Sequence, residues 1–497
     1  MSRVREKKFL VLIETDRFYI FLFITCVFLN FCPLFAQSNS KKDALPGQLD
    51  PKNYNIILII LDSVRADHLG CYNYFRKTSP AIDRLAHEGI LFEQAISQAS
   101  WSLPSHCSIF TSRYVATHDV DSYDEKLSDS EVTLAEILKI YGYETVAFTG
   151  GFFISSLFNL GQGFDIYRED LTFAKMADSV PAALDWLKVN RGKKFFLLLQ
   201  GFDGHSPFNL PGEYEKKYAD PHYQGIFKGA LLDHRIGDRL SGYTYWIDYD
   251  RKTRVDITDE DISYIKDQYD GSIAYADKYI GDFLAGLDKL GLRDNTIVIF
   301  TSYHGTPLFE HGIILRRKQG GLFEGVIRVP LIIRHPDLDK RGIRIPCQVR
   351  HIDIMPTILD FLKIPLNHQA QGRSLLPLTK AGGEDEFDPY AFSSGYKEEA
   401  VRTEKWKLID LTGYGKGLQL YDLKNDPQEK INLIQKNPKI ASLLKEKLSG
   451  LRGSSRYASE EINRISPQEI TKIKDKLKKA GYWFWETPRA AIGRDDK

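Results

Sequence analysis

Short runs of apolar residues alternate with longer amphipathic stretches along most of the chain. Five of these runs are continuous and have the length of a strand, at 55–62, 144–150, 194–203, 296–302 and 329–336. Such runs predict strands that are buried on both faces of a sheet. Helical periodicity lies between them, at 80–89, 130–142, 179–192 and 261–291. The alternation predicts an α/β fold with a mostly parallel central sheet and helices on both of its faces.

The pattern changes towards the C-terminus. Residues 401–411 and 416–423 alternate apolar and polar positions, as antiparallel strands do, and charged helical sequence follows them. This change predicts a main domain at 54–384 and a smaller C-terminal α/β subdomain with a helical tail at 385–497, built around a short antiparallel sheet.

The N-terminus has the pattern of a targeting segment. Four basic residues between Arg3 and Lys8 precede the apolar stretch 18–36, and a polar linker follows at 37–53. This order predicts a signal peptide at 1–36, cleaved near Ala36. The stretch is also about long enough to span a bilayer, so an uncleaved membrane anchor is the alternative. Either interpretation predicts a secreted or periplasmic protein.

Composition sets further limits on function. The chain has 497 residues, 43% hydrophobic and 27% charged, with a formal net charge of +1. This is enough apolar content for a large core, and the charge indicates no nucleic-acid partner. Beyond the leader only Cys71, Cys107 and Cys347 remain, an odd number without metal-binding spacing, so we expect no disulfide framework and no zinc site.

Polar residues follow three of the predicted strands. Asp62 ends the first run, Asp203 and His205 follow the third, and Tyr303 and His304 follow the fourth. Ligands of parallel sheets sit outside the carboxyl ends of the strands, so these side chains are expected to share one site. A helix-capping aspartate is the alternative role for Asp62.

Several segments, taken in order, resemble those of one enzyme family. NIILIILDSVRADHLGCYNY (55–74) resembles the first metal-binding segment of sulfatases, and WSLPSHCSIFTSRY (101–114) resembles their nucleophile segment. FTSYHGTPLFEHG (300–312) is similar to the second metal segment, and the family's later segments follow up to residue 433. The chain is therefore identified as an arylsulfatase-like member of the sulfatase family, in the alkaline phosphatase superfamily. The resemblance implies that family's fold and a metal-dependent hydrolysis of sulfate esters.

The resemblance also implies a nucleophile and its metal ligands. Ser102 stands at the nucleophile position, where sulfatases oxidise a cysteine or serine to formylglycine, whose hydrate attacks sulfur and later expels sulfate. Asp62, Ser102 and His304 match metal ligands, which implies a divalent cation, with Ca²⁺ preferred over Mg²⁺. A plain serine would form an ester that water must cleave, which suits phosphoryl transfer better. The alternative for Ser102 is a helix N-cap ahead of Pro104.

Three positions depart from the family pattern. His106 stands where arginine is usual, and histidine cannot make arginine's two-point contact with an anion. Tyr303 stands where an aspartate ligand is usual, and a phenol is a poor ligand for a hard cation. Gln319 replaces a sulfate-binding lysine, with Lys318 one residue away. Asp203 is the candidate for a compensating carboxylate.

Three more residues have candidate roles. His205 matches a family histidine near the leaving group and is a plausible general acid. Glu310 and His311 match the family sequence, and His311 is a weaker candidate for substrate binding. Arg65 is expected to form a salt bridge on a helix surface rather than to contact the anion.

Three functions follow from these residues. The first is a metal-dependent hydrolase of sulfate esters that acts through residue 102. The second is a phosphodiesterase or phosphatase on the same scaffold, with unmodified Ser102 as nucleophile. The third is a catalytically impaired, sulfatase-like binding protein. In each case the expected partner is a small-molecule or glycan sulfate or phosphate ester.

Overall fold

The computed structural model describes most of the chain after residue 52. The described ranges are 53–171, 173–206, 208–228, 245–248, 253–312, 321–338, 340–366, 369–380, 388–455 and 464–479. The chain divides into two compact units, Met1–Pro51 and Lys52–Lys497. The predicted signal peptide or anchor and the linker lie outside the described residues, and the boundary at 385 stays a prediction. Within the described ranges, no helix is both long and apolar enough to cross a membrane.

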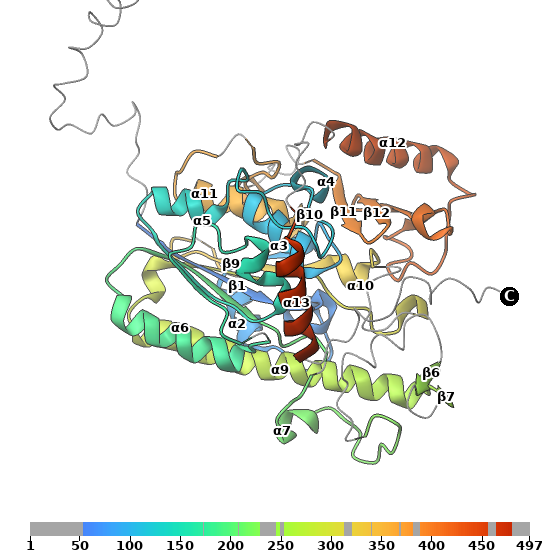
Figure 1. The fold of residues 1–497 in the computed structure, drawn as a ribbon, viewed down its shortest axis with the longest axis horizontal. Helices are drawn as coiled ribbons and strands as arrows, with labels where there is room; N and C mark the ends of the chain where they lie inside the picture. The colour runs from blue at the N-terminus through green and yellow to red at the C-terminus, as the bar shows by residue number, and fades with distance from the viewer. Residues whose placement is uncertain are drawn as a thin grey trace, which may run out of the picture. The chain divides into compact units, whose positions relative to one another are not determined.

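An eight-stranded sheet forms the centre of the fold, in the order β10-β2-β9-β8-β1-β5-β3-β4 (Figure 1). Neighbouring strands are parallel except at β9, which pairs antiparallel with both β2 and β8. The mostly parallel sheet predicted from the apolar runs is therefore confirmed. The strands are β1 (Asn55–Leu61), β2 (Ile90–Ile96), β3 (Glu144–Phe148), β4 (Ile166–Arg168), β5 (Phe195–Gly201), β8 (Thr296–Ser302), β9 (Arg328–Arg334) and β10 (Ile343–Arg350).

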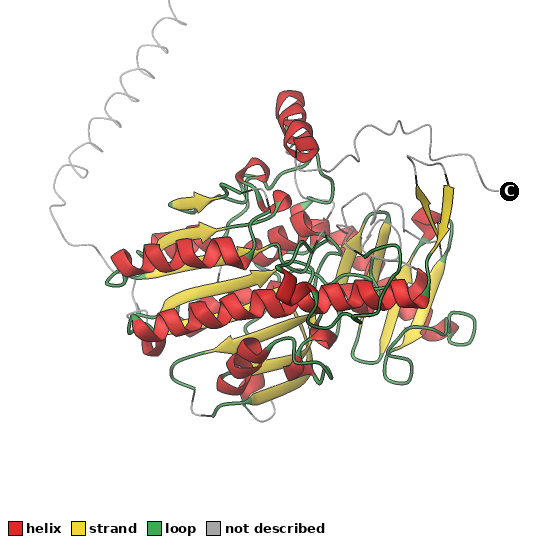
Figure 2. Ribbon diagram, turned by 90° about the horizontal axis from the view of Figure 1, so that it is seen from below, coloured by secondary structure: helices red, strands yellow, loops and turns green. Residues whose placement is uncertain are grey.

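Helices cover both faces of this sheet, as predicted. Along β1, Ile57, Ile59 and Leu61 face the core beneath α2, α6 and α9, and the alternate residues face the core beneath α3, α5 and α11. Figure 2 shows the long helices α6 and α9 side by side, running roughly along the strands. The six helices are α2 (Pro80–Glu88), α3 (Ser102–Thr111), α5 (Leu134–Ile140), α6 (Met176–Asn190), α9 (Asp259–Lys289) and α11 (Ile354–Phe361).

One predicted helix is shorter than the sequence suggested. The helix expected over 130–142 begins only at Leu134. The Thr133 hydroxyl accepts a hydrogen bond from the Glu136 N–H at 3.2 Å, and the Glu136 carboxylate accepts one from the Thr133 N–H at 2.9 Å. This reciprocal capping fixes the N-terminus at Thr133, so the preceding residues are not helical.

A four-stranded antiparallel sheet, β11-β12-β13-β14, stands in the C-terminal part. It confirms the antiparallel sheet expected there, but residues 401–411 form the end of β12, a turn and β13 rather than one strand. Helix α12 packs on the sheet through Leu444 and Leu448. Its strands are β11 (Ala391–Gly395), β12 (Glu398–Arg402), β13 (Trp406–Asp410) and β14 (Leu418–Asp422). The remaining elements are α4 (Val115–His118), α7 (Gly212–Glu215), α10 (Glu324–Ile327), α12 (Pro438–Ser455), α13 (Pro467–Lys479), β6 (Tyr245–Asp248) and β7 (Thr253–Asp256).

A buried group of charges joins this small sheet to α10; we call it the junction cluster and define it as Glu324, Arg402, Lys407 and Glu429. The fully buried Lys407 ammonium lies 3.0 Å from Glu324 and 2.5 Å from Glu429. Arg402 contacts Glu324 through two nitrogens, at 2.9 and 3.1 Å. Although burial alone raises the pKa of Glu324, the cations of Arg402 and Lys407 hold it below its usual range. Every charge in the cluster therefore faces an opposite charge.

Candidate active site

Asp62 lies at the carboxyl end of β1 and is completely buried. Its N–H donates to the Gly201 carbonyl at 2.9 Å, which ties the end of β1 to the end of β5. The Ser63 hydroxyl donates to Asp62 Oδ1 at 2.5 Å. A Cβ atom at Gly204 would lie 2.3 Å from the Asp62 carbonyl oxygen, so only glycine fits there. The ends of β1 and β5 thus fix the position of Asp62 at the carboxyl ends of the central strands.

Ser102 is the first residue of the ten-residue helix α3 and is partly exposed. The helix N-cap is Trp101, and no side chain caps this end, so the capping role considered for Ser102 is wrong. The first N–H groups of a helix have no partners within the helix and carry partial positive charge. Ser102 therefore presents its hydroxyl where a bound anion is favoured.

His106 lies one turn further along α3, and its ring is fully buried. Its Nδ1 donates to the Ser102 carbonyl at 2.7 Å, and its Nε2 makes no hydrogen bond with a described residue. Burial lowers the pKa of His106 to about 4, although the nearby Asp62 carboxylate raises it. The imidazole is therefore neutral near pH 7, and Nε2 carries a buried lone pair rather than a proton.

Tyr303 and His304 follow β8 and are both buried. The Tyr303 ring packs on His106 with centroids 4.2 Å apart and meets the His304 ring edge-on at 4.5 Å. His304 Nδ1 donates to the Gly305 carbonyl at 2.9 Å, which leaves Nε2 as the acceptor nitrogen. His106 is thus linked to Ser102 by a hydrogen bond, to Tyr303 by a ring contact and to Asp62 electrostatically, and Tyr303 also contacts His304. That Asp62, Ser102 and His304 share one site stays a prediction.

His205 and Asp203 follow β5 but face different surroundings. The His205 ring is partly exposed and stacks on Phe202 at 4.5 Å. Asp203 is buried, and its Oδ2 accepts a hydrogen bond from the Met176 N–H at 2.9 Å. Burial raises the pKa of Asp203 to about 7, although the Met176 N–H and the Lys175 ammonium lower it. Asp203 therefore faces the start of α6, and the expectation that it compensates for a lost metal ligand is not met.

Two of the remaining candidates are not described, and the others have partners of their own. Lys318 and Gln319 lie outside the described residues, so their roles stay predictions. His311 is exposed and stacks on Phe323 at 3.6 Å, while Glu310 pairs with Arg65 at 2.9 Å. The ion pair expected for Arg65 is confirmed, but the guanidinium is buried rather than on a helix surface.

The described residues do not fit the hard divalent cation that the family resemblance implies. Within the described ranges, no group of three or more histidine, cysteine or acidic side chains is arranged to hold a metal ion. Calcium takes six to eight oxygen ligands, and the position expected to supply a second carboxylate holds the buried Tyr303 ring. Asp62 and His304 are the two matching ligands that remain beside Ser102.

Some supporting residues gave no signal in the sequence. The Ser97 hydroxyl donates to the Tyr303 carbonyl at 2.6 Å and lies 3.2 Å from the Ser105 hydroxyl, so it links β8 to α3. Phe202 supports the His205 ring. A lone serine or phenylalanine after a strand carries no recognisable pattern, so only the fold reveals these contacts.

Comparison with known proteins places these residues in a family. The Sulfatase family model matches residues 54–364, and a model described as N-sulphoglucosamine sulphohydrolase, C-terminal, matches 310–454. An arylsulfatase of Clostridium perfringens is 27% identical over 443 residues, covering 76% of this chain and 90% of its own length. An N-acetylglucosamine-6-O-sulfatase of Bacteroides thetaiotaomicron is 24% identical over 480 residues, covering 79% of this chain and 85% of its own length.

Solved structures share the fold. The phosphonate monoester hydrolase of Agrobacterium radiobacter aligns with a TM-score of 0.65 and 22% identity. The alignment covers 81% of this chain and 96% of that structure's chain. BT4656 in complex with its substrate D-glucosamine-2-N,6-O-disulfate aligns with a TM-score of 0.62 and 21% identity. The alignment covers 82% of this chain and 100% of the BT4656 chain. The large mixed sheet and the small antiparallel sheet are thus those of alkaline-phosphatase-like proteins.

Proposed function

The chain belongs to the sulfatase family and is a sulfatase-type hydrolase, and from this premise we propose that it transfers the sulfuryl group of a sulfate ester to residue 102. The observation that carries this proposal is the place of Ser102 as the first residue of α3, partly exposed and without a capping role. Preorganised N–H donors at such a position stabilise the charge that develops on the transferred group.

We propose that residue 102 acts as formylglycine in the native host. The hydrate of formylglycine can expel sulfate after the sulfuryl transfer, whereas a serine sulfate ester must be cleaved by water. What the chain itself contributes is the position of residue 102: the His106 Nδ1–H holds the Ser102 carbonyl at 2.7 Å and so fixes the first turn of α3. A fixed first turn keeps the nucleophile aligned with the helix N–H groups.

His205 is proposed as the general acid. Its Nδ1 donates to the Ser206 carbonyl at 2.5 Å, so Nε2 is the nitrogen that gains and loses a proton. The ring is partly exposed beside the Asp62 strand end, where substrate can reach it. A protonated Nε2 would give its proton to the leaving alcohol oxygen as the ester bond breaks.

The roles proposed for Ser102 and His205 need no metal ion. Family membership implies Ca²⁺ ahead of Mg²⁺, and Asp62, Ser102 and His304 are the positions that match the family's ligands. Two protein ligands besides residue 102 are few for such a cation. The substrate is proposed to be a sulfated small molecule or glycan, and a secreted or periplasmic location remains part of the proposal because of the basic and apolar N-terminal sequence.

A paired assay tests this function. Purified protein is given an aryl sulfate and an aryl phosphate, and the mass of the peptide that contains residue 102 is measured in parallel. We expect turnover of the sulfate, a formylglycine mass, and a loss of about 10³-fold or more in kcat for Ser102→Ala. The control is Ser130→Ala, because Ser130 is an exposed serine. Equal turnover by Ser102→Ala would refute the role of residue 102.

Phosphate-ester hydrolysis is the second candidate. It is favoured by the neutral, buried His106 at the position where arginine is usual in the modification motif. If residue 102 remains serine and the aryl phosphate is the better substrate, the second candidate replaces the first.

A further inference from the structure

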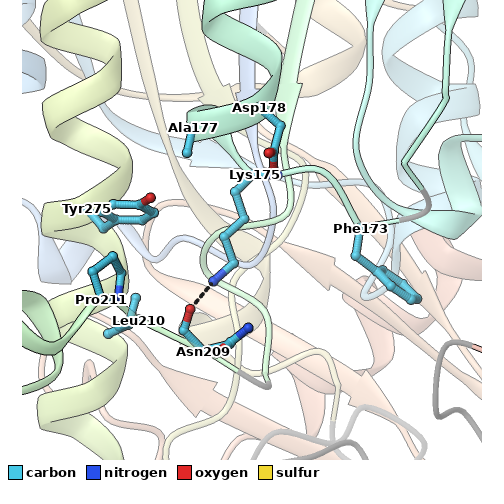
Figure 3. A pocket seen from close by; sticks show the side chains of 8 residues that line it. All are labelled: Phe173, Lys175, Ala177, Asp178, Asn209, Leu210, Pro211 and Tyr275. Atoms are coloured by element: carbon cyan, nitrogen blue, oxygen red, sulfur yellow. Dashed lines mark hydrogen bonds between the residues drawn. The ribbon is translucent and has the colours of Figure 1, made fainter.

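A cavity of about 470 Å³ lies between the start of α6, the loop after β5 and α9, where Lys175, Asn209 and Tyr275 line it (Figure 3). Figure 3 shows the Lys175 ammonium turned towards the Asn209 carbonyl oxygen, to which it donates at 2.9 Å. The cation of the cavity is thus bound by the protein's own backbone. None of its lining residues is one of the active-site candidates above. The described contacts that lead to residue 102 begin instead at its neighbour, Trp101.

The helix that starts at residue 102 has no capping side chain. Trp101 is the N-cap of α3, with an extended backbone at φ −149° and ψ 168°, and no side-chain hydrogen bond caps this end. Serine, threonine, aspartate and asparagine are preferred at an N-cap because their oxygen accepts a hydrogen bond from the second or third N–H of the helix. Tryptophan leaves these N–H groups free for an anion, but it gives up the stability that a cap supplies. The start of α3 therefore depends on other contacts.

The Trp101 indole makes two such contacts. Its Nε1–H donates to Asp121 Oδ1 at 3.2 Å, and its ring meets the Phe153 ring edge-on with centroids 5.5 Å apart. The indole is partly exposed, so these contacts rather than complete burial fix its position. A hydrogen bond to an ionised carboxylate is stronger than one between neutral groups. Asp121 therefore holds the side chain directly before residue 102.

Backbone contacts fix the loop that contains Asp121. The Glu125 carboxylate accepts a hydrogen bond from the Asp121 N–H at 2.8 Å. From the C-terminal segment, the N–H of the buried Ile465 donates to the Asp124 carbonyl at 2.9 Å, and Arg464 forms a β-bridge with Glu125. The two family-model matches end at residues 364 and 454, so this segment lies outside both. Because these contacts do not use the Asp121 carboxylate, that group can be removed without loosening the loop.

The surroundings of Asp121 make its charge depend on the indole. Burial raises the pKa of Asp121 to about 7, and the carboxylates of Glu125, Glu399 and Asp119 add to the rise, whereas the Trp101 N–H lowers it. The donor that favours the ionised carboxylate is thus the indole next to residue 102. Above neutral pH the carboxylate is ionised and the bond to the indole is charge-assisted.

We propose that Asp121 is a positioning residue for the reaction at residue 102. Its carboxylate holds the Trp101 indole, and Trp101 in turn holds the first turn of α3, where residue 102 and the free N–H groups stand. This inference rests on the proposed function, because the position of residue 102 matters only if that residue reacts. A misplacement of the reacting groups by about 1 Å can cost about 10²-fold in rate.

The test is the steady-state hydrolysis of an aryl sulfate at about pH 8.5, above the pKa of Asp121. We expect Asp121→Ala to lower kcat about 10- to 100-fold. KM should change less than about threefold, because the alignment of the nucleophile counts in the transition state. Asp121→Asn keeps an oxygen acceptor without the charge, so it should lose less activity than Asp121→Ala. Trp101→Phe removes the indole N–H but keeps a ring, and it should lower kcat to a similar extent.

A double variant shows whether Asp121 acts through Trp101. In the Trp101→Phe background, adding Asp121→Ala should lower kcat less than about twofold, because residues that act as one unit are not additive. Asp129→Asn is the matched control. Asp129 is an exposed aspartate of the same segment, and its carboxylate accepts a side-chain N–H from Asn159 at 2.7 Å. Its kcat and KM should equal those of the wild type.

Two results would overturn this role. One is a wild-type kcat in Asp121→Ala; if that variant fails to fold, a wild-type kcat in both Asp121→Asn and Trp101→Phe has the same meaning. The other is a double variant whose loss is the product of the two single losses, since Asp121 would then act independently of the indole. Turnover by the wild type but not by Ser102→Ala tests the hydrolysis separately. Failure of the positioning role with turnover intact is therefore distinguishable from failure of the function, which would remove both.

Discussion

The candidate active site and the junction cluster both bury polar side chains, but they satisfy them differently. In the junction cluster, Lys407 and Arg402 meet the carboxylates of Glu324 and Glu429 at 2.5–3.1 Å. In the active site, the buried His106 Nε2 has no hydrogen-bond partner among the described residues. Paired buried charges fix a structure, whereas a buried nitrogen without a hydrogen bond can accept one from a ligand. The junction cluster is thus expected to contribute to stability, and the active site to chemistry.

The largest expected effect is on the junction cluster. Lys407→Ala removes the ammonium and leaves Glu324 and Glu429 buried against each other, which should lower the free energy of unfolding by about 3–5 kcal/mol. Urea unfolding followed by circular dichroism measures it. Lys405→Ala is the control, because Lys405 is about half exposed and lies 3.9 Å from Asp422; its effect should be within about 1 kcal/mol. A similar small loss for Lys407→Ala would show that the cluster adds little stability.

A smaller effect is expected from restoring a carboxylate to the active site. Tyr303→Asp should make unfolding dependent on Ca²⁺, adding about 2.7 kcal/mol at a free concentration 100 times the dissociation constant. Wild-type protein should be insensitive to Ca²⁺ and to EDTA, because its described residues do not fit the cation. Thermal unfolding with and without Ca²⁺ measures both.

Tyr303→Asn is the matched control for the cation experiment. It makes a similar change in volume without the charge, so its response to Ca²⁺ should stay close to that of the wild type. A calcium response in the wild type, or none in Tyr303→Asp, would contradict the account of this site.

The smallest expected effect concerns pH. The pKa of Asp203 is about 7 in the folded chain and about 3.9 when unfolded, so the folded state keeps a proton that the unfolded state releases. The stability from this group is therefore complete below pH 4 and is lost as the pH rises towards 7. Asp203→Asn should remove this dependence, because an amide does not titrate in this range.

Urea unfolding between pH 4 and 8 measures the Asp203 effect. Asp185→Asn serves as the control, because the Asp185 side chain is 74% exposed and should leave the pH profile unchanged. Parallel profiles for wild type and Asp203→Asn would mean that the carboxyl is ionised in the folded protein.

The sequence predicted the strands of the central sheet whose residues are buried on both faces. All five apolar runs became strands, because burial on both faces requires apolar residues at every position. In the central sheet it missed β2, β10 and the three-residue edge strand β4. In β2, Glu93 and Gln94 are partly exposed, and in β10 Arg344 is exposed, so their apolar runs are interrupted.

The sequence also predicted which strand ends would meet, but not how each side chain would turn. Asp62 and His304 follow neighbouring strands, β1 and β8, as expected. Asp203 stands at the same edge, yet it turns to the start of α6, because its direction depends on the backbone after Gly201 rather than on its place in the sequence. The cavity was not predictable, since Lys175, Asn209 and Tyr275 come from three separate segments.

The position of Phe202 between two rings has a spectroscopic consequence. Its ring stacks on His205 at an interplanar angle of 22° and meets Phe173 at 43°. Aromatic ring currents shift the resonances of nearby protons, so the imidazole proton signals of His205 depend on the orientation of Phe202. A displacement of Phe173 or Phe202 would change that orientation, which makes the His205 signals an NMR reporter of how these rings pack.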